Sequence, residues 1–287
     1  KTDILRHAFG VNIGSKTMER SLREVYYTYT RSNFTNKSLW NMPSRYYCLV
    51  SPQKKIAFYF LDSNTFPFDE QQQDWLQQVY ERDEGYKRIL VMHHPILPAG
   101  KRFGSTHDAD MYLKAYGLSG KADVGEMGQW CAKTLYQKGL TEFRYVLSAH
   151  DHCMAIEKTS LSNAKGLWNL GEDTIQIISG GGGAPLSLSD KSVESYLHGE
   201  QSDDELRMGG ALRKMHAALE GRGYSEEQIS LAFGKGSDGF RFYFKHGYVW
   251  LDVINDRARV LTFDYHDGCF DGQSENIDFT QGAWVGA

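Results

Sequence analysis

Four histidines in this chain follow two apolar segments. His93 and His94 directly follow the first segment, and His150 and His152 follow the second. Imidazole is the commonest metal ligand that proteins offer, and a His-x-His spacing on extended chain places both rings on one side. If the two pairs meet, the residue types predict a metal centre. The alternative is two unrelated histidine clusters at the surface or in capping positions.

The segments before these histidines predict two buried strands. Every residue from Ile89 to Met92 is apolar, which is typical of a strand covered on both faces, and Tyr145–Ala149 is similar. Polar residues that follow such strands lie at the carboxyl edge of a sheet, where open α/β folds build their sites. We therefore expect both histidine pairs to reach one place.

Strand and helix signals alternate around these two segments. Asp69 is a candidate N-cap for a helix over 70–81, and a second helix is expected near 126–138. The alternation predicts a layered α/β architecture. Further strands are expected over residues 46–50, 56–61, 175–178, 239–244, 248–253 and 260–265.

Two other segments have distinctive compositions. Ile175–Ile178 leads into Gly180–Gly183, and such a run favours a tight turn or a close backbone approach beside the site. No Gly-Lys-Ser/Thr follows, so it is not a nucleotide-binding P-loop. Residues 186–238 are polar with helix-like stretches, and we expect them to form an insertion or lid on one domain that covers 1–287.

Composition narrows the function classes. The net charge of −4 gives no global basic field that would favour nucleic acid. No apolar segment approaches the about 18–20 residues of a spanning helix. The four cysteines are scattered, which favours reduced thiols over a disulfide framework. No signal peptide precedes Lys1 in the sequence as given, and no location is assigned.

Several ordered motifs resemble those of the calcineurin-like metallophosphoesterases, in the C-terminal half of that family. The motifs are Val91-Met-His-His-Pro-Ile96, Ala149-His-Asp-His152 and Ile178-Ser-Gly-Gly-Gly-Gly183. Trp40–Tyr47, Phe60–Asn64 and Gln73–Leu76 resemble the purple acid phosphatase branch in particular. The similarity extends from about Ser38 to Gly183, and 239–264 resembles the closing strands. The resemblance implies a four-layer β-sandwich flanked by helices, with two metal ions at its strand ends.

The resemblance also implies a role for each histidine. His93 and His150 would be ligands of one ion, and His152 would be a ligand of the other, with Ala149 in place of the usual glycine. His94 would be a nearby residue of the site wall. The implied metals are a divalent or mixed-valence pair drawn from Fe, Zn and Mn, whose identity His and carboxylate ligands do not fix.

Other polar residues near these motifs have two interpretations each. Asp151 either orients an adjacent histidine through a hydrogen bond or caps the turn. His94 and His107 are candidate contacts to phosphate or to the leaving group, with a solvated loop position favoured for His107. Asp62 is expected to fix the turn at a strand end. No catalytic residue is assigned.

The family's N-terminal motifs are not found between Lys1 and Leu39. They would supply the bridging aspartate, the asparagine ligand and the histidine that assists the leaving group. We expect that half of the fold to lie outside this chain as given, or on a separate chain.

The sequence therefore predicts a metal-dependent phosphomonoesterase that acts on a phosphorylated small molecule or a phosphoprotein. A phosphodiesterase using the same metal centre is one alternative. A binding scaffold that keeps the fold without turnover is another.

Overall fold

The structure is a computed structural model that describes most of the two histidine-bearing segments and the strands that follow them. The described residues are 44–97, 127–158, 170–171, 173–181, 216–217, 220, 225–227, 240–243, 245–266 and 269–280. His107, the start of the Trp40–Tyr47 motif and nearly all of the expected insertion over 186–238 lie outside them. The insertion or lid therefore stays a prediction.

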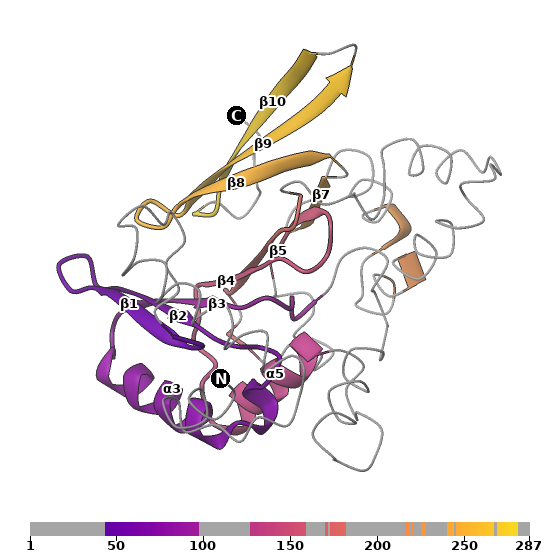
Figure 1. Ribbon diagram of the computed structural model, residues 1–287. Coiled ribbons are helices and arrows are strands. Elements are labelled where there is room, and N and C mark those ends of the chain that lie inside the picture. The colour runs from indigo at the N-terminus through magenta and orange to yellow at the C-terminus, as the bar shows by residue number, and fades with distance from the viewer. Residues whose placement is uncertain are drawn as a thin grey trace, which may run out of the picture.

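A seven-stranded mixed sheet carries both histidine motifs (Figure 1). Its order is β1-β2-β3-β4-β6-β5-β7, and its four central strands, β2, β3, β4 and β6, run parallel. The strands expected before both histidine pairs are confirmed as β3 and β4. The bounds are β1 Tyr47–Ser51, β2 Ile56–Phe60, β3 Lys87–Val91, β4 Tyr145–Ser148, β5 Met154–Lys158, β6 Ile175–Ser179 and β7 Phe240–Tyr243.

A smaller antiparallel sheet of three strands lies over one face of the first (Figure 1). Its strands are β8 His246–Asp252, β9 Arg257–His266 and β10 Cys269–Asp278, in the order β10-β9-β8. The expected strands over 248–253 and 260–265 correspond to β8 and β9. No strand is expected over β10, because its sequence is mostly polar.

Two helices cover the opposite face of the seven-stranded sheet (Figure 1). α3 (Glu70–Arg82) follows a short 3-10 turn, η1 (Phe66–Phe68), and α5 is Met127–Gln137. The Asp69 carboxylate accepts a hydrogen bond from the Gln72 N–H and so caps α3 as expected. Within the described ranges, no helix has the length and apolar character that crossing a membrane would require.

Side chains of the central strands alternate between two cores. Ala57, Tyr59 and Leu90 pack with the helices, whereas Ile56 and Ile89 pack with the three-stranded sheet. The strands are apolar at successive positions because both faces are covered. The described residues thus form three layers, helix, sheet and sheet, of mixed α/β type. The fourth layer of the expected sandwich is not among them and stays a prediction.

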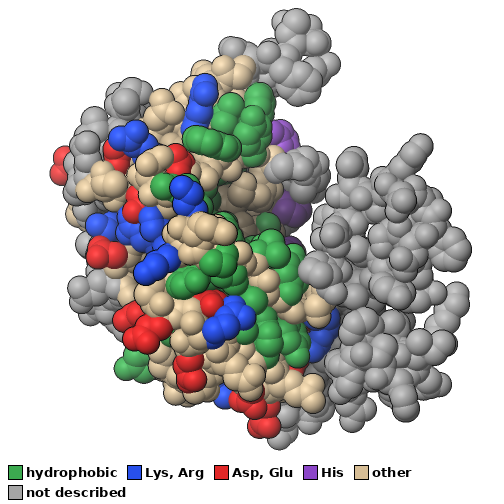
Figure 2. Space-filling view, turned by 90° about the vertical axis from the view of Figure 1, so that its left-hand side faces the viewer, with side chains coloured by type: hydrophobic (Ala, Val, Ile, Leu, Met, Phe, Trp, Pro, Cys, Tyr) green, Lys and Arg blue, Asp and Glu red, His purple; other side chains and the backbone are tan. Residues whose placement is uncertain are grey.

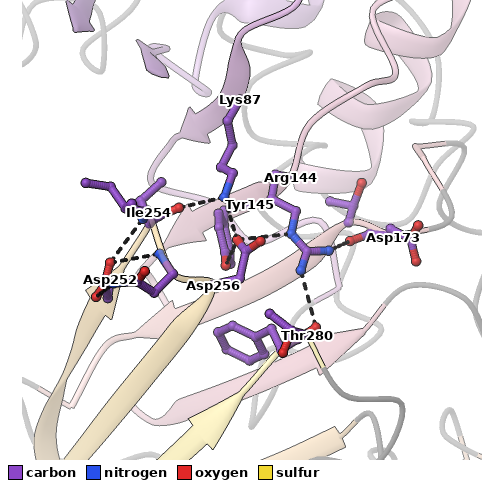
Figure 3. Close-up of polar contacts among 12 residues, drawn as sticks. Lys87, Arg144, Tyr145, Asp173, Asp252, Ile254, Asp256 and Thr280 are labelled. Atoms are coloured by element: carbon purple, nitrogen blue, oxygen red, sulfur yellow. Dashed lines mark hydrogen bonds and ion pairs between the residues drawn. The ribbon is translucent and has the colours of Figure 1, made fainter. Parts of the chain in front are cut away.

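An ion-pair network closes the amino edge of the parallel strands (Figure 3). Asp256, in the turn between β8 and β9, accepts hydrogen bonds from Tyr145 OH at 2.7 Å and Lys87 Nζ at 2.9 Å. Arg144 Nε lies 3.4 Å from the same carboxylate oxygen, and Lys87 Nζ also donates to the Val253 carbonyl at 2.7 Å. The turn of the small sheet is thereby fastened to the starts of β3 and β4.

The electrostatics of this network favour the charged form of Asp256. Burial raises the pKa of the Asp256 carboxyl, but hydrogen bonds from Tyr145 and Lys87, together with the charge of Arg144, outweigh it, and the pKa lies below its ordinary value. Burial and the adjacent Asp256 carboxylate raise the pKa of Tyr145, so its hydroxyl remains a donor.

Candidate metal site at the carboxyl edge

Three imidazoles meet beyond the carboxyl ends of β3 and β4. His150 Nδ1 lies 2.9 Å from His93 Nε2, and one nitrogen from each of His93, His94 and His150 falls within 4.8 Å of the others. The His94 ring centroid is 4.4 Å from that of His150 and 5.0 Å from that of His93. Figure 2 shows histidine side chains at the right-hand margin of the face that it draws. The expected meeting of the two motifs is therefore observed.

The separation of the His93 and His150 nitrogens fits two ligands of one ion. Imidazole nitrogens bind Zn²⁺ at about 2.1 Å, and two of them on a tetrahedral ion lie roughly 3.4 Å apart. The observed distance is 2.9 Å, so these two rings would need to separate by only about 0.5 Å. Without an ion, the same distance suits a hydrogen bond in which one ring donates and the other accepts, according to the tautomers. These two side chains can thus hold a metal ion without a large rearrangement.

The three histidines His93, His94 and His150 are called the triad below. The two strands that precede them are joined at this edge by backbone hydrogen bonds. Met92 N–H donates to the Leu147 carbonyl at 3.0 Å, and Ala149 N–H donates to the His93 carbonyl at 3.1 Å. These bonds extend the ladder between β3 and β4 past the end of both strands. They fix the histidine-bearing segments relative to each other.

The turn that carries His150 has an unusual backbone conformation. His150 has a φ of +62°, a left-handed conformation that is uncommon outside glycine, although Asn, Asp and His adopt it more often than other residues. Asp151 N–H donates to the Ala149 carbonyl at 2.7 Å, which closes the turn tightly around His150. Such strain clusters at functional sites, where it sets the direction of a side chain.

Gly180 makes room for this turn. The turn after β4 passes over the end of β6 on its way to β5, because β6 lies between β4 and β5 in the sheet. A Cβ atom at Gly180 would overlap the carbonyl oxygen of Asp151. The close backbone approach expected of the glycine run is confirmed at Gly180, and Gly182 and Gly183 lie outside the described residues.

A buried glutamine holds the segment that follows His94. Gln176, in β6, accepts hydrogen bonds from the N–H groups of Ile96 and Leu97 at 2.8 and 3.1 Å, and its amide donates to the Leu97 carbonyl at 2.6 Å. On the other side, Gly128 of α5 approaches so closely that a Cβ there would overlap the Pro95 carbonyl. The segment after His94 is therefore held between β6 and α5.

His94 is the most buried member of the triad, with 4% of its surface exposed. Its Nδ1 lies 2.9 Å from the Ser63 hydroxyl, and its backbone N–H donates to the same oxygen at 3.3 Å. Ser63 follows β2, so the third parallel strand also contributes to the site. His94 lies in the wall of the site, as the sequence motifs predict, whereas no motif predicts the part of Ser63.

The other predicted residues lie around the triad. Asp151 is buried, and His152 is half-buried and is not part of the group of three imidazoles. Its assignment to a second ion stays a prediction, as does the choice between the two roles of Asp151. Asp62 caps its turn by accepting from the Asn64 N–H at 3.2 Å and lies 3.7 Å from Arg45 Nη1.

The cysteines nearest the site are packed thiols. Burial and the neighbouring Asp151 carboxylate raise the pKa of the Cys153 thiol well above its ordinary value. Cys48, Cys131 and Cys153 form no disulfide in the described part of the chain. This agrees with the prediction of reduced, structural thiols.

A second group of side chains of metal-ligand type lies in the 186–238 segment. One ligand atom from each of His216, Glu220 and Glu226 falls within 4.8 Å of the others, and His216 Nε2 is 2.9 Å from Glu226 Oε2. Both glutamates are exposed. An exposed His–Glu pair accounts for this arrangement without an ion.

Comparisons with known proteins add little to this geometry. No family model matches the chain, and no curated protein matches it. A solved structure titled "Structure of PhoD" aligns with 92% of this chain and 49% of its own, at 10% identity and a TM-score of 0.46. The chain thus spans about half the length of the chain that it matches. A likeness this weak supports no assignment of fold, reaction or substrate.

Proposed function

We propose that this chain carries part of a metal-dependent phosphoric ester hydrolase, and that its substrates are phosphomonoesters. The observation that carries the proposal is the convergence of His93 Nε2 and His150 Nδ1, 2.9 Å apart, at the carboxyl edge of parallel strands. The order of the His-His-Pro, His-Asp-His and glycine-run motifs supports it by resemblance.

The residues have distinct parts in the proposed site. His93 and His150 would hold one ion, and His152 would contribute to a second ion, with further ligands supplied from outside the described residues. Metal ions in such a pair lower the pKa of a bound water and stabilise charge on phosphoryl oxygens. The left-handed turn at His150 and the hydrogen bonds of Gln176 keep the imidazoles in place. Fe, Zn and Mn all suit these ligands.

A titration of metal into the protein tests the proposal. Chelator-treated protein, in its longest natural form, is expected to regain hydrolysis of an aryl phosphate monoester when Zn²⁺, Mn²⁺ or Fe is added. His93→Ala is expected to weaken metal binding by more than about 100-fold, since even outer-shell partners contribute 10–100-fold. Phe58→Ala, within β2 on the face that packs against the three-stranded sheet, serves as a control for damage to the fold.

The same assay separates the alternatives. A higher kcat/KM for an aryl phosphate diester than for the monoester would replace the monoesterase proposal with a phosphodiesterase. Tight metal binding with no turnover of either ester would favour the binding scaffold. If His93→Ala bound metal as tightly as the unchanged protein, the metal site itself would be wrong.

A further inference from the structure

Ser63 and His94 form a buried pair, and both hydrogen bonds of the Ser63 hydroxyl involve His94. Ser63 is 1% exposed and lies just beyond β2. Its oxygen accepts the His94 backbone N–H at 3.3 Å and lies 2.9 Å from His94 Nδ1. Within the described ranges, the Ser63 hydroxyl has no other hydrogen-bond partner.

The hydrogen-bond donors and acceptors of Ser63 and His94 are compatible with one tautomer of the His94 ring. A serine hydroxyl has one proton to donate, and leaving it without an acceptor in a buried position is costly. The His94 backbone N–H is itself a donor, so among the described residues the only acceptor within reach of the Ser63 hydroxyl proton is His94 Nδ1. In a neutral imidazole with Nδ1 unprotonated, the ring proton is on Nε2.

This arrangement is the reverse of that around a typical metal-ligating histidine. A ligating imidazole binds the metal through one nitrogen and donates the N–H of the other to an acceptor. His94 instead accepts a hydrogen bond at Nδ1, so the N–H of its ring is on Nε2. Its ring packs against His150 and His93, which places the imidazole within the same site.

We propose that Ser63 is a positioning residue that holds His94 in the Nε2–H tautomer. His94 then acts as a hydrogen-bond donor to an anionic phosphoryl oxygen and not as a third metal ligand. The tautomer follows from the Ser63–His94 pair alone, whereas the role toward phosphate rests on the proposed function. The triad is thereby divided into two ligands, His93 and His150, and one donor.

Nitrogen chemical shifts of the imidazole test the tautomer directly. Protein labelled with ¹⁵N-histidine and freed of metal is examined at about pH 8.5, where an ordinary imidazole is neutral. The His94 signals are identified by their loss in His94→Gln. Nδ1 is expected to show an unprotonated shift and Nε2 a protonated one. Ser63→Ala should move both toward an average of the two tautomers, and Ser63→Thr should restore them.

Two results would overturn the positioning role of Ser63. One is a protonated His94 Nδ1 in the unchanged protein. That measurement does not depend on whether any variant folds. The other is a folded Ser63→Ala whose His94 shifts match those of the unchanged protein.

A separate measurement tests the donor role. His94→Leu, which has no donor, is expected to keep the metal content of the unchanged protein and to bind inorganic phosphate about 10-fold more weakly, as for loss of a hydrogen bond to a charged group. Loss of an ion in His94→Leu would make His94 a ligand and overturn the donor role. If the unchanged protein bound neither metal nor phosphate, the proposed function and the donor role would fail together, while the nitrogen shifts would still decide the tautomer.

Discussion

The two ends of the parallel strands in the seven-stranded sheet carry different kinds of side chain. At their amino edge, one carboxylate, Asp256, accepts hydrogen bonds from Lys87 and Tyr145, and opposite charges meet. At their carboxyl edge, three imidazoles crowd together, one of them on a left-handed turn. The amino edge is built to stabilise the fold. The carboxyl edge instead has close contacts and an uncommon backbone angle, features that are common at functional sites.

The largest expected effect separates function from stability at the carboxyl edge. His150→Ala and His150→Gly should both reduce metal affinity and ester hydrolysis by more than about 100-fold, because a ligand is lost. Glycine adopts the φ of +62° without strain, so His150→Gly should unfold at a temperature no lower than His150→Ala. Metal content and thermal unfolding are measured on both. Normal metal binding by His150→Gly would show that the backbone matters here and the imidazole does not.

The next largest effect tests the crowding beneath the histidine turn. Gly180→Ala must displace the Asp151 carbonyl, and we expect a loss of about 3 kcal/mol in the free energy of unfolding, together with weaker metal binding. Gly272→Ala is the matched control, since neither glycine has a positive φ and a Cβ at Gly272 would meet its nearest neighbours at 3.5 Å, an ordinary contact distance. It should change the free energy of unfolding by only about 1 kcal/mol or less. Equal losses in urea unfolding of the two variants would contradict the close approach.

A smaller effect is expected from breaking the amino edge. Asp256→Ala removes the common acceptor of Lys87 and Tyr145 and should lower the free energy of unfolding by about 1–3 kcal/mol. Metal affinity should stay unchanged, because the network lies at the other end of the strands. Asp74→Ala, which breaks a surface pair with Lys138, should have an effect below about 1 kcal/mol. Weaker metal binding in Asp256→Ala would show that the two edges are coupled.

The smallest effect is a pH dependence at the amino edge. Because the pKa of Asp256 is lowered in the folded state, the unfolded chain binds its proton first as pH falls. The stabilisation is therefore fully present above the unfolded pKa, about 3.9. It is lost as pH falls through the folded value. The stability difference between the unchanged protein and Asp256→Asn, measured by urea unfolding, should shrink below about pH 4. A difference that stayed constant down to pH 3 would contradict this.

Much of the site's location could be predicted, because local patterns encode it. The apolar run before His93 and the capped, amphipathic segment after Asp69 each specify an element through nearby residues alone, and β3 and α3 formed where expected. Parallel strands then bring their carboxyl ends together without further information. The meeting of His93 with His150 follows from that rule.

The partners of these histidines could not be predicted in the same way. Ser63 and Gln176 are polar residues next to or within buried strands, and their hydrogen-bond partners lie 31 and 80 residues away in the chain. Nothing in the local sequence specifies such a pairing. β10 was missed for a related reason, since a polar strand is stabilised by the neighbour to which it is hydrogen-bonded.

The position of β6 between β4 and β5 has a consequence for the order of folding. The His150 turn joins two strands separated by two strand spacings, roughly 10 Å, and the strand that fills the gap comes later in the chain. During synthesis, β4, the turn and β5 leave the ribosome before β6 does. The turn can close over Gly180 only after Ile175–Ser179 has entered the gap. Metal capture at this edge would therefore report that the centre of the sheet is complete.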